Sequence, residues 1–314
     1  MPDLNGSNRI TADEIDFLMG MLDRREYIRS LGFMPFEWQD QLLDSEAKRI
    51  IILAARQSGK STIVSSLPCH LAKYKAGSLC IVIAPTEKQA KEDMLKIRQF
   101  MQLDKTYPKI RRASDDMLFL ENRSRIIVVP ATEAGARGYS KPDLVLIDEA
   151  SRVDDEVYNS GITAMFTGNP DGRLILLSTP HGKQGFFFQR WVMNGDGWER
   201  YEIRSPWVPV VAPGGHDLVR MDNRSIQNFV EDRKNRNIWA CLSPRHENYE
   251  EQLDILRDQG QRLYLQEFCC DFVETDTTVF DYEDIMAAFE DTGEENTLEF
   301  DDLEVDTDAE VLEL

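Results

Sequence analysis

Residues 50–62 read Ile50-Ile51-Ile52-Leu53-Ala54-Ala55-Arg56-Gln57-Ser58-Gly59-Lys60-Ser61-Thr62. An apolar run ends in a short polar turn and a helical pattern follows, which is the order strand, phosphate-binding loop, helix. Backbone N–H groups in such a loop point at phosphate oxygens, and the helix dipole adds to the attraction. Lys60 would reach the β- and γ-phosphates of a nucleoside triphosphate, and the Ser61 hydroxyl would bind Mg²⁺.

The loop departs from its consensus at one position, because G-x-x-x-x-G-K-[ST] expects glycine where the chain has Ala54. Support comes about 90 residues later, where the apolar residues 144–147 end in Asp148-Glu149. Asp148 at the tip of a strand can hold Mg²⁺, directly or through water, and Glu149 can polarise the attacking water. The two motifs together predict an ATPase.

Two further segments each have a functional and a structural interpretation. Ser178-Thr179-Pro180 follows the apolar residues 173–177, and its hydroxyls can sense the γ-phosphate or simply form a strand-ending turn. Phe36, Trp38 and Gln39 precede the loop by about twenty residues. They can frame an adenine base by stacking and a hydrogen bond, or they can form a hydrophobic staple under the sheet.

The order of apolar segments predicts the fold class. Four continuous apolar strands alternate with helices, which favours a mostly parallel sheet covered on both faces, as in P-loop NTPases of the RecA/ASCE type. A nucleotide then binds at the carboxyl ends of the strands. The expected strands are 50–54, 79–84, 144–147, 173–177 and 198–203, with an antiparallel pair at 117–120 and 125–129. The expected helices are 12–31, 40–47, 60–75, 87–103, 154–166, 224–237 and 246–268, and 205–215 is expected to be a loop.

We expect four parts along the chain. They are an N-terminal helical segment (1–32), the P-loop ATPase core (33–205), a small helical lid or linker subdomain (206–280) and an acidic tail (281–314). Basic residues on the expected lid helices could form a solvated face or contact DNA.

Charge is distributed unevenly. Residues 263–314 contain 19 of the 56 acidic residues and no Lys or Arg, which leaves 37 acidic and 36 basic residues in 1–262. The net charge of −20 therefore belongs to the C-terminal sixth and does not argue against a nucleic-acid partner.

Several classes of protein are disfavoured by composition. The sequence has no run of about 18 apolar residues, so it indicates no membrane span, and its N-terminus lacks a signal-peptide pattern. The five cysteines and four histidines form no C-x-x-C or H-E-x-x-H pattern. We therefore expect neither a zinc site nor a disulfide framework, and we expect the protein to act in a reducing cytoplasm.

Six spaced motifs occur together: Phe36-Glu37-Trp38-Gln39, Ala55-Arg56-Gln57-Ser58-Gly59-Lys60-Ser61, Gly135 with Arg137-Gly138, Leu146-Ile147-Asp148-Glu149-Ala150, Ser178-Thr179-Pro180-His181-Gly182 and Gln266-Glu267-Phe268-Cys269-Cys270-Asp271-Phe272. With them the chain, over roughly residues 30–280, resembles the ATPase domain of the large terminase subunit of tailed phages, the motor that drives viral DNA into a preformed capsid. That family tolerates a small residue in place of the first loop glycine and favours Arg-Gln inside the loop.

The resemblance implies roles for the matching positions. Phe36, Trp38 and Gln39 would contact adenine, and Glu149 would be the catalytic carboxylate. Ser178-Thr179-Pro180 would couple hydrolysis to lid movement. Nucleotide phosphates and Mg²⁺ would be held by Arg56, Gln57, Ser58, Gly59, Lys60, Ser61, Thr62 and Asp148.

Two arginines are candidates for stabilising the transition-state charge. Arg56 could act in cis from the loop, whereas Arg137 could act in trans on the nucleotide of a neighbouring subunit. The sequence leaves both open, and we favour Arg137 in trans with Arg56 orienting groups locally.

The resemblance also implies partners and a place of action. The partners would be double-stranded viral DNA, the portal of a procapsid, the small terminase subunit and further copies of this chain in a ring, assembled from subunits that can be monomeric in solution. The chain would act in the cytoplasm of the infected host cell at the portal vertex, with no membrane partner.

Large terminases usually continue into an RNase H-like nuclease domain. Only 34 residues follow Phe280, so we expect this chain to hydrolyse ATP and not to cut DNA. The alternatives are a helicase-like translocase and a non-catalytic nucleotide-binding assembly subunit. Lys60, Asp148 and Glu149 argue against the latter.

Overall fold

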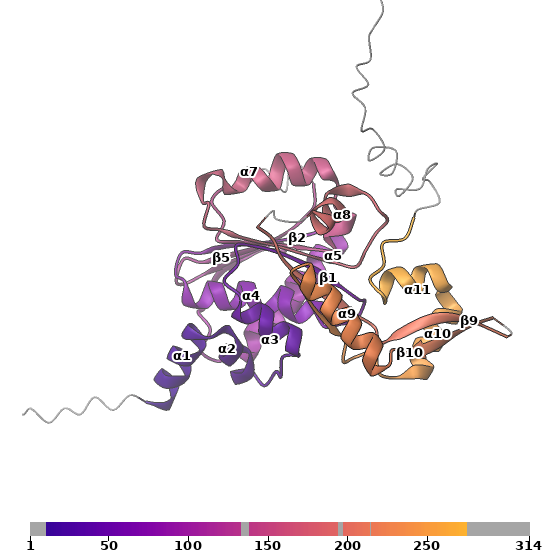
Figure 1. The fold of residues 1–314 in the computed structure, drawn as a ribbon. Coiled ribbons are helices and arrows are strands. Elements are labelled where there is room, and N and C mark those ends of the chain that lie inside the picture. Colours follow the sequence, from indigo (N-terminus) through magenta and orange to yellow (C-terminus); the bar gives the residue numbers. More distant parts are fainter. Residues whose placement is uncertain (1–10, 133–137, 194–196, 214, 275–314) are drawn as a thin grey trace, which may run out of the picture. The chain divides into compact units, whose positions relative to one another are not determined.

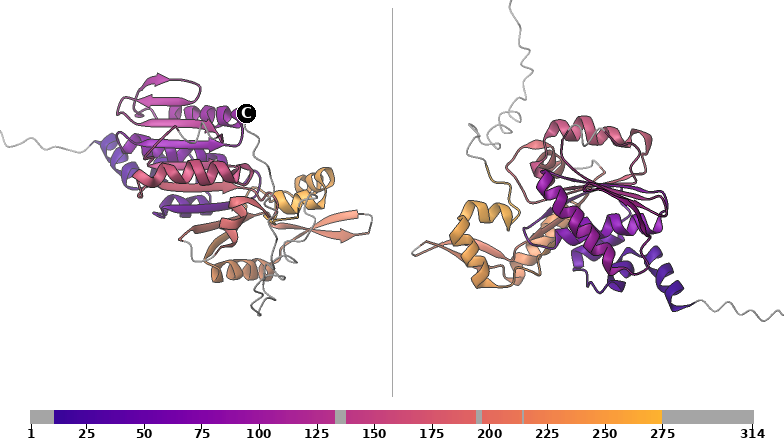
Figure 2. Two further views of the ribbon diagram at one scale, coloured as in Figure 1. Left: turned by 90° about the horizontal axis from the view of Figure 1, so that it is seen from above. Right: turned by 180° about the vertical axis from the view of Figure 1, so that it is seen from behind.

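The computed structural model describes residues 11–132, 138–193, 197–213 and 215–274. The described residues up to Val273 form one compact unit. A nine-stranded sheet runs through it in the order β11-β8-β1-β7-β6-β2-β5-β4-β3 (Figures 1 and 2). Six neighbouring pairs are parallel, and β4 runs antiparallel to both β3 and β5. The strands are β1 (Arg49–Ala54), β2 (Leu79–Ala84), β3 (Ile110–Ala113), β4 (Met117–Leu120), β5 (Arg125–Pro130), β6 (Leu144–Asp148), β7 (Arg173–Ser178), β8 (Glu199–Arg204) and β11 (Ile238–Leu242).

Each face of the sheet has its own core because successive strand residues point to opposite faces. In β1, Ile50 and Ile52 join one buried cluster while Ile51 and Leu53 join the other. Figure 1 shows α2 to α5 on one face and α7 and α8 on the other. The helices of the first group are α2 (Arg24–Ser30), α3 (Glu37–Asp44), α4 (Lys60–Tyr74) and α5 (Glu87–Leu103), and α1 (Ala12–Leu22) precedes them in the chain. The second comprises the short turns η1 (Ala150–Arg152), η2 (Val157–Ile162, π-helical) and η3 (Phe166–Gly168), with α7 (Thr163–Met165) and α8 (Gly185–Val192).

The chain after β8 encloses a third buried cluster. A hairpin of β9 (Trp207–Ala212) and β10 (Gly215–Arg220) precedes α9 (Asn223–Asn235), and α10 (Tyr249–Gln259) and α11 (Gln261–Glu267) follow β11. Leu218 of the hairpin packs with residues of α10 and α11 and with two residues beyond α11, namely Leu253, Leu256, Tyr264, Phe268 and Cys269. This cluster places the end of α11 next to the carboxyl edge of the large sheet, where Ser205 N donates to Phe268 O over 2.7 Å.

The α/β class with a mostly parallel sheet is confirmed. The division at residue 205 is wrong for β11, because this strand pairs with β8 in the large sheet. The expected loop 205–215 is also wrong, since most of it forms the hairpin. The expected tail (281–314) lies outside the described residues.

Three expected helices are interrupted for local reasons. Extended backbone at Asp23 ends α1, and its carboxylate caps α2 by accepting Arg25 N at 2.8 Å. Gly260, with φ of 82°, separates α10 from α11, a left-handed φ that glycine adopts without penalty. The segment 154–166 contains the π-helical η2 instead of a regular helix. Within the described residues, no helix is both long and apolar enough to cross a membrane.

Candidate functional site

The loop between β1 and α4 is held from both sides by backbone contacts. Ala55 N donates to Ile203 O and Arg56 N to Glu267 O, each over 2.7 Å. His246 Nε2 lies 2.8 Å from Arg56 O and donates to it. Burial lowers the pKa of His246 to about 4, and the charges of Lys60 and Arg245 lower it further, so this imidazole is neutral. The Arg56 backbone is thus fixed while its side chain is exposed.

Gly59 is the one loop position where glycine is sterically required. Its φ is 101°, and a Cβ there would lie 2.9 Å from Gln39 Nε2 and 3.3 Å from a Phe36 ring carbon. Gln57 also has a left-handed φ of 59°. Ala54, the departure from consensus, ends the buried β1 and is itself fully buried. It lies inside the sheet, so a small side chain fits there.

Lys60 begins α4 and points back across the loop. Its Nζ donates to Ala54 O (3.1 Å) and Ala55 O (3.2 Å) and lies 3.9 Å from Glu149 Oε1. The side chains of Lys60 and Glu149 are 10% and 22% exposed. The contact with Glu149 is longer than a hydrogen bond, so the ammonium keeps donor capacity that phosphate oxygens can use.

Asp148 and Glu149 lie at the carboxyl end of β6, as predicted. Burial raises the pKa of Asp148 to about 7, the negative charges of Asp93 and Glu149 raise it further, and Lys60 lowers it. Asp93 on α5 is 2% exposed, and its Oδ2 has no hydrogen-bond partner among the described residues. Such a concentration of buried negative charge favours a cation.

The residues present fit a magnesium ion. Mg²⁺ prefers hard oxygen ligands, and Ser61 Oγ and the Asp148 carboxylate are of this type. Lys96 Nζ of α5 lies 3.5 Å from Ser61 Oγ and 3.4 Å from Asp93 Oδ1, so a positive group already lies beside the Ser61 hydroxyl and the Asp93 carboxylate.

Glu149 is held by a pair of serines. Its φ of 48° is left-handed, which is uncommon for a residue with a side chain. Ser178 Oγ at the end of β7 donates to Glu149 Oε2 over 3.4 Å, and Ser151 Oγ lies 2.7 Å from Ser178 Oγ. Thr179 is 2% exposed, and its hydroxyl has no partner among the described residues. The segment Ser178-Thr179-Pro180 therefore lies beside the catalytic candidate, as the sequence predicted.

The adenine segment is only partly as expected. Trp38 is fully buried in the core under the sheet, so direct contact between its ring and a base does not fit this structure. Gln39 Oε1 accepts Phe36 N and Gln39 Nε2 donates to Gly59 O, each over 2.9 Å. This amide therefore supports the loop, and Phe36 remains as the base-stacking candidate.

Phe36 lines a small cavity of about 60 Å³ together with Gln39, Thr62 and Arg245. The Arg245 guanidinium lies over the Phe36 ring, 5.4 Å from its centroid. Because ligand pockets are usually several hundred Å³, a base entering here has to displace Arg245 or a neighbour.

Sequence reasoning missed several residues of this site: Asp93, Lys96, Ser151, Arg245 and His246. Asp93 and Lys96 lie on a helix rich in charges, and Arg245 and His246 follow an edge strand, so no motif marked them. Arg137, the trans candidate, lies outside the described residues.

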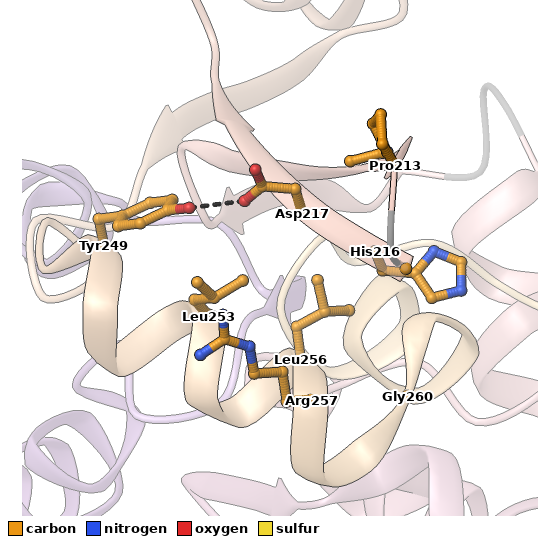
Figure 3. A pocket seen from close by; sticks show the side chains of 10 residues that line it. Pro213, His216, Asp217, Tyr249, Leu253, Leu256, Arg257 and Gly260 are labelled. Carbon is orange, nitrogen blue, oxygen red and sulfur yellow. Dashed lines mark hydrogen bonds between the residues drawn. The ribbon is translucent and has the colours of Figure 1, made fainter.

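A separate cavity of about 460 Å³ lies between β10 and α10 (Figure 3). Tyr249 Oη donates to Asp217 Oδ1 there over 2.6 Å, and Arg257 lies on the same helix as Tyr249. None of the predicted site residues lines this cavity.

Known proteins resemble the chain in sequence and in fold. The large terminase subunit of Thermus phage G20c is 24% identical over 185 residues, which are 52% of this chain and 37% of that protein. The match thus spans little more than a third of that relative's length. The ATPase domain of the Thermus phage P74-26 large terminase matches with a TM-score of 0.56 at 19% identity, covering 79% of this chain and 98% of that one. A point mutant of that domain gives 0.57 at 18% identity with the same coverage.

At these identities the structural matches establish a common fold. The family model described as "Terminase large subunit, T4likevirus-type, N-terminal" matches residues 51–287. Since this range covers most of the chain and contains the loop, Asp148-Glu149 and Ser178-Thr179-Pro180, the chain belongs to the large terminase subunit family, in its T4likevirus-type N-terminal region.

Proposed function

We propose that this chain is an ATP-hydrolysing motor subunit that translocates double-stranded viral DNA into a procapsid. The observation that carries the ATPase assignment is the opposition of Lys60 Nζ and Glu149 Oε1 across 3.9 Å, at the carboxyl ends of β1 and β6. Membership of the large terminase family supports the choice of DNA packaging as the work performed.

Lys60 and Glu149 change partners when a triphosphate binds. Among the described residues, Lys60 Nζ is bonded to backbone carbonyls of the loop and loosely to Glu149, so phosphate oxygens can replace these acceptors. Glu149 then loses its cationic neighbour and accepts the proton of the attacking water. Ser178, itself bonded to Ser151, holds the carboxylate in position for this transfer.

Ser61 and Asp148 would hold the magnesium ion, and Arg56, Gln57, Ser58, Gly59 and Thr62 complete the phosphate-binding loop. With the ion held by Ser61 and Asp148, the site would gain positive charge against the charge that develops on the phosphates. Phe36 would stack on adenine, Gln39 would keep the loop in register with it, and Thr62 would line the base pocket.

Arg137 would stabilise the transition state of a neighbouring subunit in a ring, with Arg56 orienting groups in cis. Mixing Arg137→Ala protein with Glu149→Ala protein under assembly conditions should restore part of the activity. The first variant retains a Glu149 site and the second an intact Arg137, so a mixed ring contains competent interfaces. No recovery in the mixture would count against a trans role for Arg137.

The proposed partners are double-stranded viral DNA, the portal of a procapsid, the small terminase subunit and further copies of the chain. The work takes place in the infected cell at the portal vertex. DNA phosphates would be the main contacts, so DNA binding should weaken steeply with salt.

The test compares ATP turnover with DNA-free procapsids or portals, with DNA alone and with neither. A packaging motor should be stimulated by the portal, whereas stimulation by DNA alone would favour a helicase-like translocase. A protein that binds ATP without turnover in every condition would be a non-catalytic assembly subunit. Lys60→Ala should abolish nucleotide binding in each case.

A further inference from the structure

Glu267, the last residue of α11, takes no part in the chemistry proposed above. It belongs to the sequence motif Gln266-Glu267-Phe268, in which the carboxylate has no assigned role. Glu267 is 5% exposed, and burying a carboxylate is costly unless it is paired. The partners of Glu267 therefore indicate which segments of the chain it holds together.

The side chain and the backbone of Glu267 contact two different motifs. Its Oε1 accepts a hydrogen bond from Arg152 Nη2 over 3.3 Å. Arg152 ends η1, the turn that begins directly after Glu149. The carbonyl oxygen of Glu267 accepts Arg56 N over 2.7 Å. One residue thus joins the phosphate loop to the turn that carries the catalytic candidate.

A third motif lies within electrostatic reach of the same pair. His181 follows Ser178-Thr179-Pro180 directly. Burial lowers the pKa of His181, the charge of Arg152 lowers it further, and the charge of Glu267 raises it. The Arg152–Glu267 pair thus contacts the phosphate loop and the turn after Glu149, and its charges reach the residue that follows the third motif.

We propose that Glu267 is a positioning residue that couples the state of the γ-phosphate to α11, and this inference rests on the proposed ATPase function. A shift of the turn after Glu149 is carried by Arg152 to the Glu267 carboxylate. Tyr264 and Phe268, one turn before and one residue after Glu267, pack in the cluster shared with β10 and α10. Movement of Glu267 is thereby passed to the elements that follow β8.

The alternative is that this ion pair only stabilises the fold. The chain offers a matched control in Glu202 of β8, which is 2% exposed and accepts Arg233 Nε over 2.5 Å. Arg233 and Arg152 are both partly exposed, with 21% and 41% of the side chain accessible. Within the described residues, the hydrogen bonds of the Glu202 carboxylate come from Arg233 of α9 and not from the phosphate loop or the turn after Glu149.

The experiment measures hydrogen–deuterium exchange of residues 261–268 in the full chain, with Mg²⁺ and either ATPγS or ADP. The wild type should exchange differently in the two states. In Glu267→Gln, and separately in Arg152→Gln, that difference should fall about tenfold, within the range typical of coupling between sites. Both nucleotides should still bind with affinities within about twofold of the wild type, because neither residue contacts the loop through its side chain. Glu202→Gln should keep the full difference.

A purely structural role predicts a different pattern. Exchange would rise equally in both nucleotide states, and Glu202→Gln would behave like Glu267→Gln; either result overturns the inference. Arg152→Gln guards against misfolding, since it breaks the same pair from its more exposed side. An undiminished difference in both variants, with nucleotide binding intact, overturns the coupling role alone. A wild-type chain that binds no nucleotide overturns the proposed function and the coupling role together.

Discussion

Helix α4 carries a buried lysine at each end, and the two lysines have opposite surroundings. Near its C-terminal end, Lys73 Nζ is 2.6 Å from Asp104 Oδ2 and donates to Thr106 Oγ1 over 2.8 Å. Both side chains of this pair are 5% exposed. At the N-terminal end, Lys60 Nζ is 3.9 Å from Glu149 Oε1, and its hydrogen bonds within the described part of the chain go to loop carbonyls.

The difference distinguishes a structural ion pair from a functional one. The other oxygen of Asp104 accepts the N–H and the hydroxyl of Thr106, so the pair at the Lys73 end has its hydrogen bonds satisfied. Around Lys60, Asp93 Oδ2 and the hydroxyls of Ser58 and Thr179 lack partners among the described residues, whereas beside Lys73 the Tyr27 hydroxyl lacks one. Polar groups left unsatisfied in a folded protein are groups that a ligand can satisfy.

Loss of the Glu149 carboxylate should have the largest effect. Glu149→Ala is expected to reduce ATP turnover by about 10²–10⁴-fold, since general-base catalysis supplies a factor of this size. Nucleotide affinity should persist because Lys60 and the loop are intact. Turnover by phosphate release and ADP affinity by fluorescence titration check the two halves.

An exposed acid nearby, Glu156, provides the control. Glu156→Ala should leave turnover unchanged, and turnover retained in Glu149→Ala would remove this carboxylate from the mechanism.

Breaking the Lys73–Asp104 ion pair should lower stability and leave ATP turnover unchanged. Asp104→Ala leaves Lys73 buried without its partner and should lower the free energy of unfolding by about 3 kcal/mol. ATP turnover per folded molecule should not change, because Asp104 lies at the far end of α4 from the loop. Denaturant unfolding and turnover on the same preparation provide the measurement.

The exposed Asp115 is the matched control, and Asp115→Ala should change stability by less than about 0.5 kcal/mol. A stable Asp104→Ala protein with impaired turnover would contradict the assignment of stability to the Lys73 end of α4 and of catalysis to the Lys60 end.

The sequence was most informative where one strand carries both core and motif. In β1 and β6 an uninterrupted apolar run requires burial on both faces, and the polar residues that end each run must then meet at one edge of the sheet. The positions of Lys60, Asp148, Glu149 and Ser178 follow from that argument, and the structure brings them together as expected.

Other parts depended on long-range contacts that no local pattern carries. Trp38 and Gln39 are adjacent in sequence, but one packs in the core and the other holds Gly59, and sequence alone cannot divide such a motif. β11 is short and follows a polar helix, so its place beside β8 is determined by tertiary pairing. His246 and Glu267 reach the loop only because the chain returns to the sheet after β10.

Lowering the pH should reduce the free energy of unfolding through a buried histidine at each end of α4, and by similar amounts. Burial lowers the pKa of His70, which contacts Gly20 O, and of His246 to about 4. The unfolded chain therefore takes up these protons first as the pH falls, so stability is fully present above about pH 6.5 and is lost towards pH 4. At pH 5, about 1.5 units below the ordinary pKa of histidine, each histidine should account for a loss of about 2 kcal/mol.

His70→Gln and His246→Gln retain a donor for the carbonyl and remove the titration. Each should reduce the difference in unfolding free energy between pH 7 and pH 5, and the double variant should show the sum because the sites do not share partners. An unchanged difference in either variant would show that the histidine in question is not neutral in the fold.

The smallest expected effect is on nucleotide affinity, and it tests whether the ligand site at the Lys60 end of α4 includes the pocket beside Phe36. Arg245 has a stacking contact with Phe36, and the described structure records no hydrogen bond or ion pair for it. A base that enters beside Phe36 displaces this guanidinium from the Phe36 ring, and we expect the guanidinium to stack on the exposed face of the base instead. An exposed cation–π contact is worth about 0.5–1 kcal/mol, or roughly two- to fivefold in affinity. Arg245→Ala should weaken ATP and ADP binding by that factor and leave pyrophosphate binding unchanged, because the cation meets the base and not the phosphates. Arg236→Ala, at the exposed end of α9, should change neither. Equal weakening of pyrophosphate binding would show that Arg245 contacts the phosphates and not the base.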